Sequence, residues 1–226
     1  MLFNDVLGQQ AAKDSLRQMA MSDRVAHALL FAGPGGSGSL SLALAFAQYL
    51  LCARPTPTDA CGQCPHCLKA AKLIHPDIHF SFPTIGTNVK SDHFLPQWRQ
   101  AMATNPYLSL NDWLQKIGAE NKQGNINKEE CLNIIRKMSL KTFESPRKVL
   151  IIWRPEFLGK EGNRLLKLIE EPPENTHFIL VAEQPDQILN TILSRCQLFK
   201  IPALTDSDIV AGLRQWKHLD EEKALA

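Results

Sequence analysis

The stretch LLFAGPGGSGSLSLALAFAQYL, from Leu29 to Leu50, decides the fold class of this chain. It begins with an apolar run that ends at Gly33, and glycines and serines follow. From Ser39 to Cys52 the sequence is rich in alanine and leucine and contains no helix breaker. An apolar run without alternation is typical of a parallel strand buried on both faces, and the later segment favours a helix. The stretch therefore predicts a strand, a glycine-rich turn and a helix.

The same alternation of strands and helices continues along the chain. Buried strands are expected at 147–153 and 177–183, an extended segment at 76–83, and a last short strand within 194–204. Helices are expected at 5–24, 69–74, 126–140 and 162–171, the last stopped by two prolines, and a new helix opens at 205. Strands that alternate with helices predict an α/β domain with a parallel central sheet and helices on both sides.

Composition limits the function classes. The chain has 226 residues, 44% of them hydrophobic, and a formal net charge of +2. The charge gives no argument for a strongly basic nucleic-acid surface. The N-terminus lacks the pattern of a signal peptide, and the apolar stretches are shorter than the roughly 20 residues of a membrane span. We therefore expect a cytoplasmic protein that does not interact with membranes, with cysteines that are reduced or metal-bound.

The glycine-rich turn resembles an incomplete phosphate-binding loop. Gly33, Gly35 and Gly38 lie within the first six places of the pattern G-x-x-x-x-G-K-[ST], but Ser39 and Leu40 stand where lysine and a hydroxyl residue belong. The lysine would reach the β- and γ-phosphates and the hydroxyl would hold Mg²⁺. We expect no bound ATP, or only weak binding. A turn without any ligand and a relic of a nucleotide site both remain open on this loop alone.

The strand expected at 147–153 favours the interpretation of the loop as a relic of a nucleotide site. A nucleotide-hydrolysing domain needs carboxylates at the end of a second apolar strand, for the metal and the attacking water. Here the strand at 147–153 ends in Trp153 and Arg154, and Glu156 follows behind a proline. Lysine, hydroxyl and both carboxylates are all missing, so the pattern indicates a nucleotidase scaffold without its own chemistry.

Four cysteines predict a metal site. Cys52, Cys61, Cys64 and Cys67 have the spacing C-x8-C-x2-C-x2-C, in a turn-rich loop with Asp59 at its tip. Four thiolates close a tetrahedral zinc site of the structural kind, and an iron–sulfur cluster is the alternative. Zinc is preferred because no other redox machinery is evident. The remaining two cysteines, at 131 and 196, lie apart and are read as non-ligands.

One arginine stands out near the last strand. Ser194, Arg195 and Cys196 precede it, and the bland interpretation is a surface arginine paired with a carboxylate. A chain without its own ATPase site can still offer a guanidinium to the γ-phosphate bound by a neighbouring subunit. Such a finger raises rates by roughly 10³–10⁵.

Taken together, these motifs resemble the delta-prime subunits of bacterial DNA polymerase III clamp loaders, of the AAA+ class. The matching segments are VLGQ at 6–9, AHALLFAGPGGSG at 26–38, the cysteine loop, HPD at 75–77, NRLLKLIEEPPENTHFILVAE at 163–183 and TILSRCQ at 191–197. They cover most of 1–83 and 126–205. The combination is specific, although each segment alone is not.

The resemblance implies a RecA-like AAA+ domain and a catalytically inert subunit. Residues 1–203 would form this domain, with a zinc loop at 52–67 and an insertion at 84–125 of unassigned role, and 204–226 would begin a helical lid domain. Arg195 would be the trans-acting arginine finger, the four cysteines would bind zinc, and Ala182 would stand where active relatives carry a polar sensor residue. The implied partners are the gamma/tau and delta subunits, and through them the sliding clamp and primed DNA.

Two other functions remain as alternatives. An active gamma/tau-type clamp-loader ATPase shares the zinc cysteines and Ser-Arg-Cys, but needs the missing lysine and carboxylates. A zinc-dependent DNA-binding module is disfavoured, because the cysteine loop offers few cations to phosphates.

Overall fold

A computed structural model describes residues 1–119 and 122–215. A five-stranded sheet with the order β2-β3-β4-β1-β5 forms its centre, and all four strand pairings are parallel. The strands are β1 (Ala28–Ala32), β2 (Ile78–Ser81), β3 (Lys148–Trp153), β4 (Thr176–Ala182) and β5 (Gln197–Lys200). The predicted parallel α/β fold is therefore confirmed. No helix in the described ranges is long and apolar enough to span a membrane.

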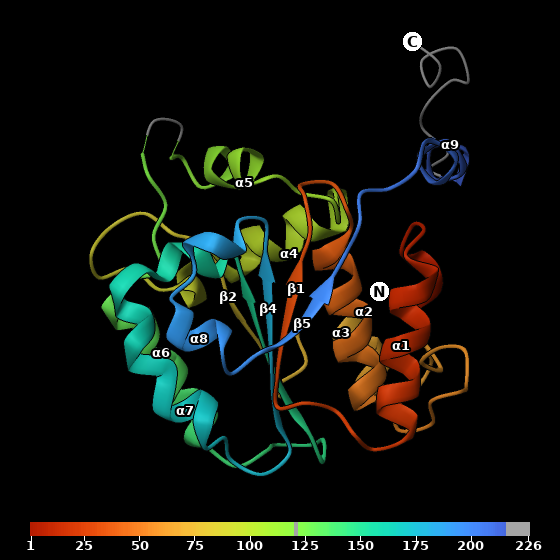
Figure 1. Ribbon diagram of the computed structural model, residues 1–226, viewed down its shortest axis with the longest axis horizontal. Coiled ribbons are helices and arrows are strands. Elements are labelled where there is room, and N and C mark those ends of the chain that lie inside the picture. Colours follow the sequence, from red (N-terminus) through yellow and green to blue (C-terminus); the bar gives the residue numbers. More distant parts are fainter. Residues whose placement is uncertain (120–121, 216–226) are drawn as a thin grey trace.

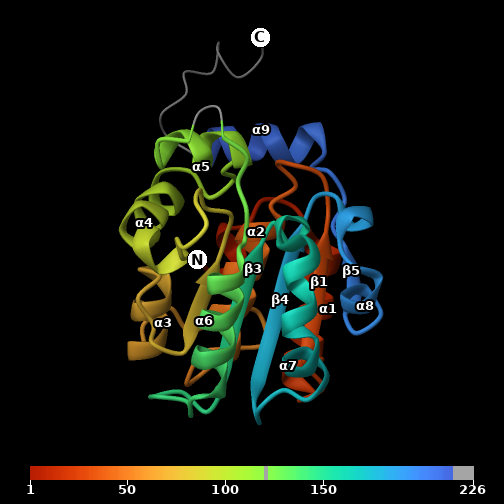
Figure 2. The same cartoon turned by 90° about the vertical axis from the view of Figure 1, so that its left-hand side faces the viewer.

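Helices cover both faces of the sheet (Figures 1 and 2). One face carries α1 (Gln10–Met21), α2 (Ser39–Leu51) and α3 (Pro65–Ala71), and the other carries α6 (Lys128–Ser139), α7 (Leu166–Glu170) and α8 (Asn190–Leu193). The helices α4 (Leu95–Thr104) and α5 (Leu110–Lys116) lie near the carboxyl ends of the strands, and α9 (Asp206–Gln215) is the last described element. Short 3-10 helices complete the fold: η1 (Phe3–Asp5), η2 (Ser91–Phe94), η3 (Pro155–Leu165) and η4 (Pro185–Gln187).

Each central strand supplies both cores with side chains, because successive residues point to opposite faces. In β1, Leu29 and Phe31 pack with α2, whereas Ala28 and Leu30 pack with the helices of the opposite face. β3 and β4 divide their side chains in the same way. The continuous apolar runs of the sequence thus correspond to strands buried on both faces.

Three expected helices have clearly different bounds in the structure. The helix expected at 69–74 is α3, which begins four residues earlier at Pro65 and ends at Ala71. The helix expected at 5–24 begins only at Gln10, because Gly8 and Gln9 both have a positive φ and interrupt the segment after η1. The segment 162–171 is α-helical only in α7, since residues 155–165 form the 3-10 helix η3. Differences of this kind arise at helix ends, where the hydrophobic pattern carries the least information.

The segment 84–125, interpreted as an insertion, has its two ends side by side in the structure. Thr84 and Asn125 exchange two backbone hydrogen bonds of 2.8 Å. Between them, the rings of Trp98 and Trp113 are fully buried and pack against each other edge to face, with centroids 5.2 Å apart. Trp98 also stacks on Phe82, at 4.4 Å. The segment is therefore part of the core on the α2 side of the sheet.

The aspartate of the HPD motif anchors the loop before β3. The buried carboxylate of Asp77 accepts hydrogen bonds from the N–H groups of Phe143, Glu144 and Ser145 at 2.6–2.9 Å. Burial by itself would raise the pKa of Asp77, but these three donors outweigh it and hold the pKa below its ordinary value of 3.8.

Asp77→Asn is therefore expected to destabilise the fold by about 1.5–3 kcal/mol at neutral pH. Since the pKa is lowered in the folded state, the wild-type carboxylate contributes stability above about pH 4, and this contribution is lost as the pH falls through the folded-state pKa. Urea unfolding at pH 7 and pH 3 measures both effects. The difference between wild type and variant should shrink at pH 3, whereas the exposed control Asp186→Asn should change little at either pH.

Candidate functional site

The glycine-rich loop lies at the carboxyl end of β1, as the sequence predicts. Gly33 follows β1, and its N–H donates to the carbonyl oxygen of Ala182 at the end of β4, at 3.1 Å. A Cβ at Gly33 would lie 2.4 Å from the Ile201 carbonyl oxygen, so only glycine fits there. Gly38 precedes α2 with φ +82°, a backbone conformation that favours glycine. The loop thus keeps the backbone shape of a phosphate cradle at a helix N-terminus.

The side chains of the loop bond to one another. The hydroxyl groups of Ser37 and Ser39 are buried and 2.8 Å apart. Leu40, which replaces the hydroxyl residue of the pattern, is buried on α2. Ser39 therefore fills the lysine position with a short group that has a partner within the loop.

A cationic side chain occupies the end of β3. Arg154 has a left-handed backbone, φ 62° and ψ 55°, which directs its guanidinium toward two acidic groups. It forms an ion pair with Glu183, just after β4, and its Nε lies 3.3 Å from an Oε of Glu156. Glu156 is buried, which raises its pKa, and it accepts the N–H groups of Glu183 and Gln184. Where a hydrolysing site holds metal-binding carboxylates, this chain has two glutamates that share one arginine as their ion-pair partner.

The space in front of the loop is small. The loop, the ends of β3 and β4, and the segment Pro106–Leu108 line a partly open pocket of about 30 Å³. In this conformation the pocket has room for one or two water molecules and not for a triphosphate.

The four cysteines of the predicted metal site come together. Their Sγ atoms all lie within 4.8 Å of one another, and Cys61 and Cys67 approach to 3.9 Å. Four sulfurs about 2.3 Å from a central zinc form a tetrahedron with edges of about 3.8 Å. The donor set therefore fits a tetrahedral metal ion. The cysteines at 131 and 196 lie outside this cluster, as expected.

The environments of the thiols differ. The N–H groups of Gln63 and Cys64 lower the pKa of Cys61 to about 6, whereas burial raises the pKa of Cys67 and of Cys52. A bound divalent cation would let the buried thiols ionise as well.

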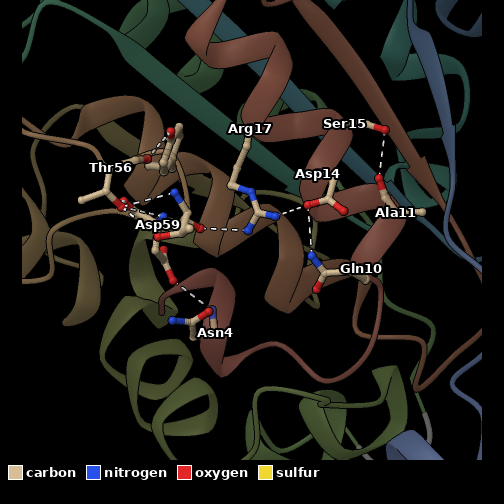
Figure 3. A network of polar contacts seen from close by, with 10 residues as sticks. Asn4, Gln10, Ala11, Asp14, Ser15, Arg17, Thr56 and Asp59 are labelled. Carbon is tan, nitrogen blue, oxygen red and sulfur yellow. Dashed lines mark hydrogen bonds and ion pairs between the residues drawn. The ribbon is translucent and has the colours of Figure 1, made fainter.

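The cysteine loop is also held by the N-terminal segment. The carboxylate of Asp59 accepts the N–H groups of Phe3 and Asn4 at 3.1 and 3.0 Å, and Arg17 of α1 donates to the carbonyl oxygen of Thr58 at 2.8 Å (Figure 3). Asp59, at the tip of the loop, is thus buried. The sequence does not indicate this burial, because the partners of Asp59 lie more than fifty residues away in the chain.

Two histidines and a glutamate form a second cluster beside α3. His66 Nδ1 lies 2.9 Å from His75 Nε2, which is 3.4 Å from an Oε of Glu144. The other ring nitrogen of His75 accepts the N–H of Asp77, so a neutral His75 carries its proton on Nε2. Because Nε2 then donates, this arrangement suits a hydrogen bond better than a metal ion.

Arg195 lies at the other end of the sheet from the loop. It precedes the edge strand β5, whose pairing with β1 is parallel, so about 20 Å of strand separates it from the level of the loop. Its Nε donates to Glu170 at 2.6 Å and its Nη1 donates to the Thr191 carbonyl oxygen at 2.6 Å. The side chain is 33% exposed. Arg195 is therefore accessible to another molecule and out of reach of the chain's own loop.

The neighbours of Arg195 differ in exposure. Ser194 is exposed and accepts a hydrogen bond from Arg195 at 3.2 Å. Cys196 is partly buried, and burial raises its pKa to about 11, so it remains a thiol at neutral pH.

Two participants in the site were missed from the sequence. Glu183 has a weak signal, since it directly follows a predicted buried strand. Tyr107, which covers the loop, has none, because it lies in the segment whose elements were least readable.

Comparison with known proteins identifies the family. Residues 8–205 match the family described as "DNA polymerase III, delta subunit". The chain belongs to this family. The DNA polymerase III subunit delta' of Bacillus subtilis is a curated relative of this chain. The two sequences are 29% identical over 176 residues, which cover 77% of this chain and 42% of the relative. The delta' subunit of Escherichia coli is 25% identical over 203 residues, covering 88% and 49%. The resemblance to delta-prime subunits is thereby confirmed.

Other relatives of this chain are named as tau or gamma subunits and not as delta'. DNA polymerase III subunit tau of Bacillus subtilis is 29% identical over 214 residues, covering 94% of this chain and 31% of the relative. A solved structure of a DNA polymerase III gamma subunit-related protein from Thermotoga maritima shares the fold, with TM-score 0.52 and 16% identity over 93% of this chain and 56% of that chain. This chain thus spans half or less of the length of these curated relatives, and overall identity does not separate delta' from tau.

Proposed function

We propose that this protein is a non-catalytic subunit of a replicative clamp loader. It would act in the cytoplasm with gamma/tau and delta subunits, and support ATP-dependent loading of the sliding clamp onto primed DNA. Its own contribution would be Arg195, placed at the ATP site of a neighbouring subunit. Residues 1–203 would form the AAA+ domain and 204–226 the start of a lid; residues 216–226 lie outside the described part.

The proposal rests on the residues that occupy the phosphate loop and the end of β3 in this chain. Ser39 and Leu40 supply neither an ammonium group nor a metal-binding hydroxyl, and Arg154 holds Glu156 and Glu183 as ion-pair partners. Arg195 is also paired with a carboxylate, that of Glu170, but its guanidinium is partly exposed at the edge of the sheet. The combination suits a protein that completes another subunit's site.

An active gamma/tau-type ATPase is the second candidate, favoured by the 29% identity to a tau subunit. Such an enzyme needs a cation at the phosphates and carboxylates for Mg²⁺. The arrangement around Arg154 argues against it, because both nearby carboxylates are already paired with an arginine.

Zinc is the metal that we propose for the four cysteines. Cys52, Cys61, Cys64 and Cys67 would fill all four positions of a tetrahedral site, which leaves none for water and gives zinc a structural role. The ion would bridge the end of α2 to the start of α3.

Equilibrium binding of radiolabelled ATP with Mg²⁺ to the isolated chain tests the inert site. We expect no binding at micromolar concentrations and no release of phosphate, because the loop lacks the lysine at position 39 and the metal-binding hydroxyl at position 40, and Tyr107 leaves only a small pocket in front of it. An active gamma/tau subunit assayed in parallel is the positive control. Micromolar affinity with turnover would favour the ATPase instead.

A further inference from the structure

The segment Pro106–Leu108 lies directly on the phosphate loop. A Cβ at Gly38 would come within 2.9 Å of Cε1 of Tyr107, so the aromatic ring rests against the glycine that precedes α2. In a working loop this helix N-terminus is the place where phosphate oxygens bind. Tyr107 thus occupies space that a nucleotide would need.

Hydrogen bonds fix the segment on both sides of the ring. The Tyr107 hydroxyl accepts the N–H of Leu7 at 2.8 Å, which links the segment to the start of the chain. Ser41, on the first turn of α2, donates its hydroxyl to the carbonyl oxygen of Pro106 at 2.8 Å. The contacts therefore come from the loop helix and from the N-terminal segment at once.

The base of the segment is anchored in the core of the domain. The Thr84–Asn125 pairing closes it, and the Trp113 indole N–H donates to the Pro83 carbonyl oxygen at 2.8 Å. Trp98 and Trp113 are buried beneath it. Because two anchored helices, α4 and α5, flank Pro106–Leu108, the segment is held on the loop by the core and not only by its own contacts.

We propose that the insertion supplies an internal ligand for the phosphate loop: Tyr107 and its neighbours take the place of a nucleotide and tie the loop to Leu7. The loop is thereby held in its shape by contacts from within the chain. Tyr107 would do this whether or not Arg195 acts on a neighbouring subunit.

Restoring the missing groups tests the proposal. The substitutions Ser39→Lys and Leu40→Thr recreate G-x-x-x-x-G-K-T, and Tyr107→Ala removes the ring. Isothermal titration with Mg-ATP and with Mg-ADP would compare the wild type, the double variant, and the triple variant that also carries Tyr107→Ala. We expect the triple variant to bind at least about tenfold more tightly than the double variant. Equal affinity of the two would overturn the proposal, while leaving the proposed function intact.

The control for the ring is Tyr107→Phe in the double-variant background. It keeps the aromatic bulk and loses the hydroxyl with its hydrogen bonds, among them the bond from Leu7, so nucleotide exclusion should persist. An affinity equal to that of the triple variant would contradict exclusion by the ring.

Hydrogen exchange of the single variant Tyr107→Ala provides a readout that needs no nucleotide and no restored loop. We expect faster exchange of the Leu7 amide and of amides in 36–41 than in the wild type, with unchanged exchange in β3 and β4. Unchanged protection at Leu7 and the loop would refute the proposal, even if the triple variant failed to fold.

Discussion

Replacing Arg195 by alanine in the full-length protein is expected to reduce ATP hydrolysis at the neighbouring site of a reconstituted loader by about 10³-fold or more. The guanidinium is partly exposed and far from the chain's own loop, and in the proposed role its loss removes charge stabilisation from another subunit's γ-phosphate. DNA-stimulated ATPase and clamp loading measure the effect. Wild-type rates in the Arg195→Ala loader would exclude the finger role.

Two further variants separate catalysis from structure. Arg195→Lys keeps the charge but loses the planar fork, and should restore little activity. Arg164→Ala removes an arginine of similar exposure, which pairs with Glu161 on the same side of the sheet, and should leave the rates near wild type. Size-exclusion chromatography checks that each loader assembles, since Arg195 also binds Glu170 and Thr191 within the chain.

Replacing Cys64 by serine is expected to abolish metal binding and to cost more than about 4 kcal/mol, the range seen when a structural metal is lost. For a chain of this size that lowers Tm by about 8–16 °C. Elemental analysis should find about one zinc per wild-type chain and none in the variant, and calorimetry gives the shift in Tm. A wild-type chain without stoichiometric metal would contradict the zinc proposal.

Loss of the metal in the Cys64→Ser variant should change the structure of the cysteine loop and leave the sheet folded. Asp59 and Arg17 hold the cysteine loop to the N-terminal segment without any metal, and the sheet is covered by helices on both faces (Figures 2 and 3). Far-ultraviolet circular dichroism of the Cys64→Ser variant at 20 °C should therefore match the wild type. Cys131→Ala, which removes a buried thiol from the opposite core, is the matched control and should keep its zinc.

Much of the candidate site could be predicted because its signals are local. A glycine loop between a buried strand and a helix, and cysteines two residues apart, require only neighbouring residues to form the pattern. The sequence also predicted that the strand β3 is followed by Arg154 and not by the carboxylates of a hydrolysing site. It did not indicate Glu183 as the partner of Arg154, because that pairing depends on the neighbouring positions of β3 and β4 in the sheet.

Local sequence patterns predicted the parallel sheet, the four-cysteine cluster, and the absence of the lysine, hydroxyl and carboxylates that a nucleotide-hydrolysing site needs. The packing of the folded chain was needed to show that Tyr107 covers Gly38, that Asp59 is buried against Phe3 and Asn4, and that Arg195 pairs with Glu170. The physical reason is that hydrophobic period, glycine and cysteine spacing act over a few residues. Contacts between distant segments depend instead on how the whole core packs, and no local pattern encodes them.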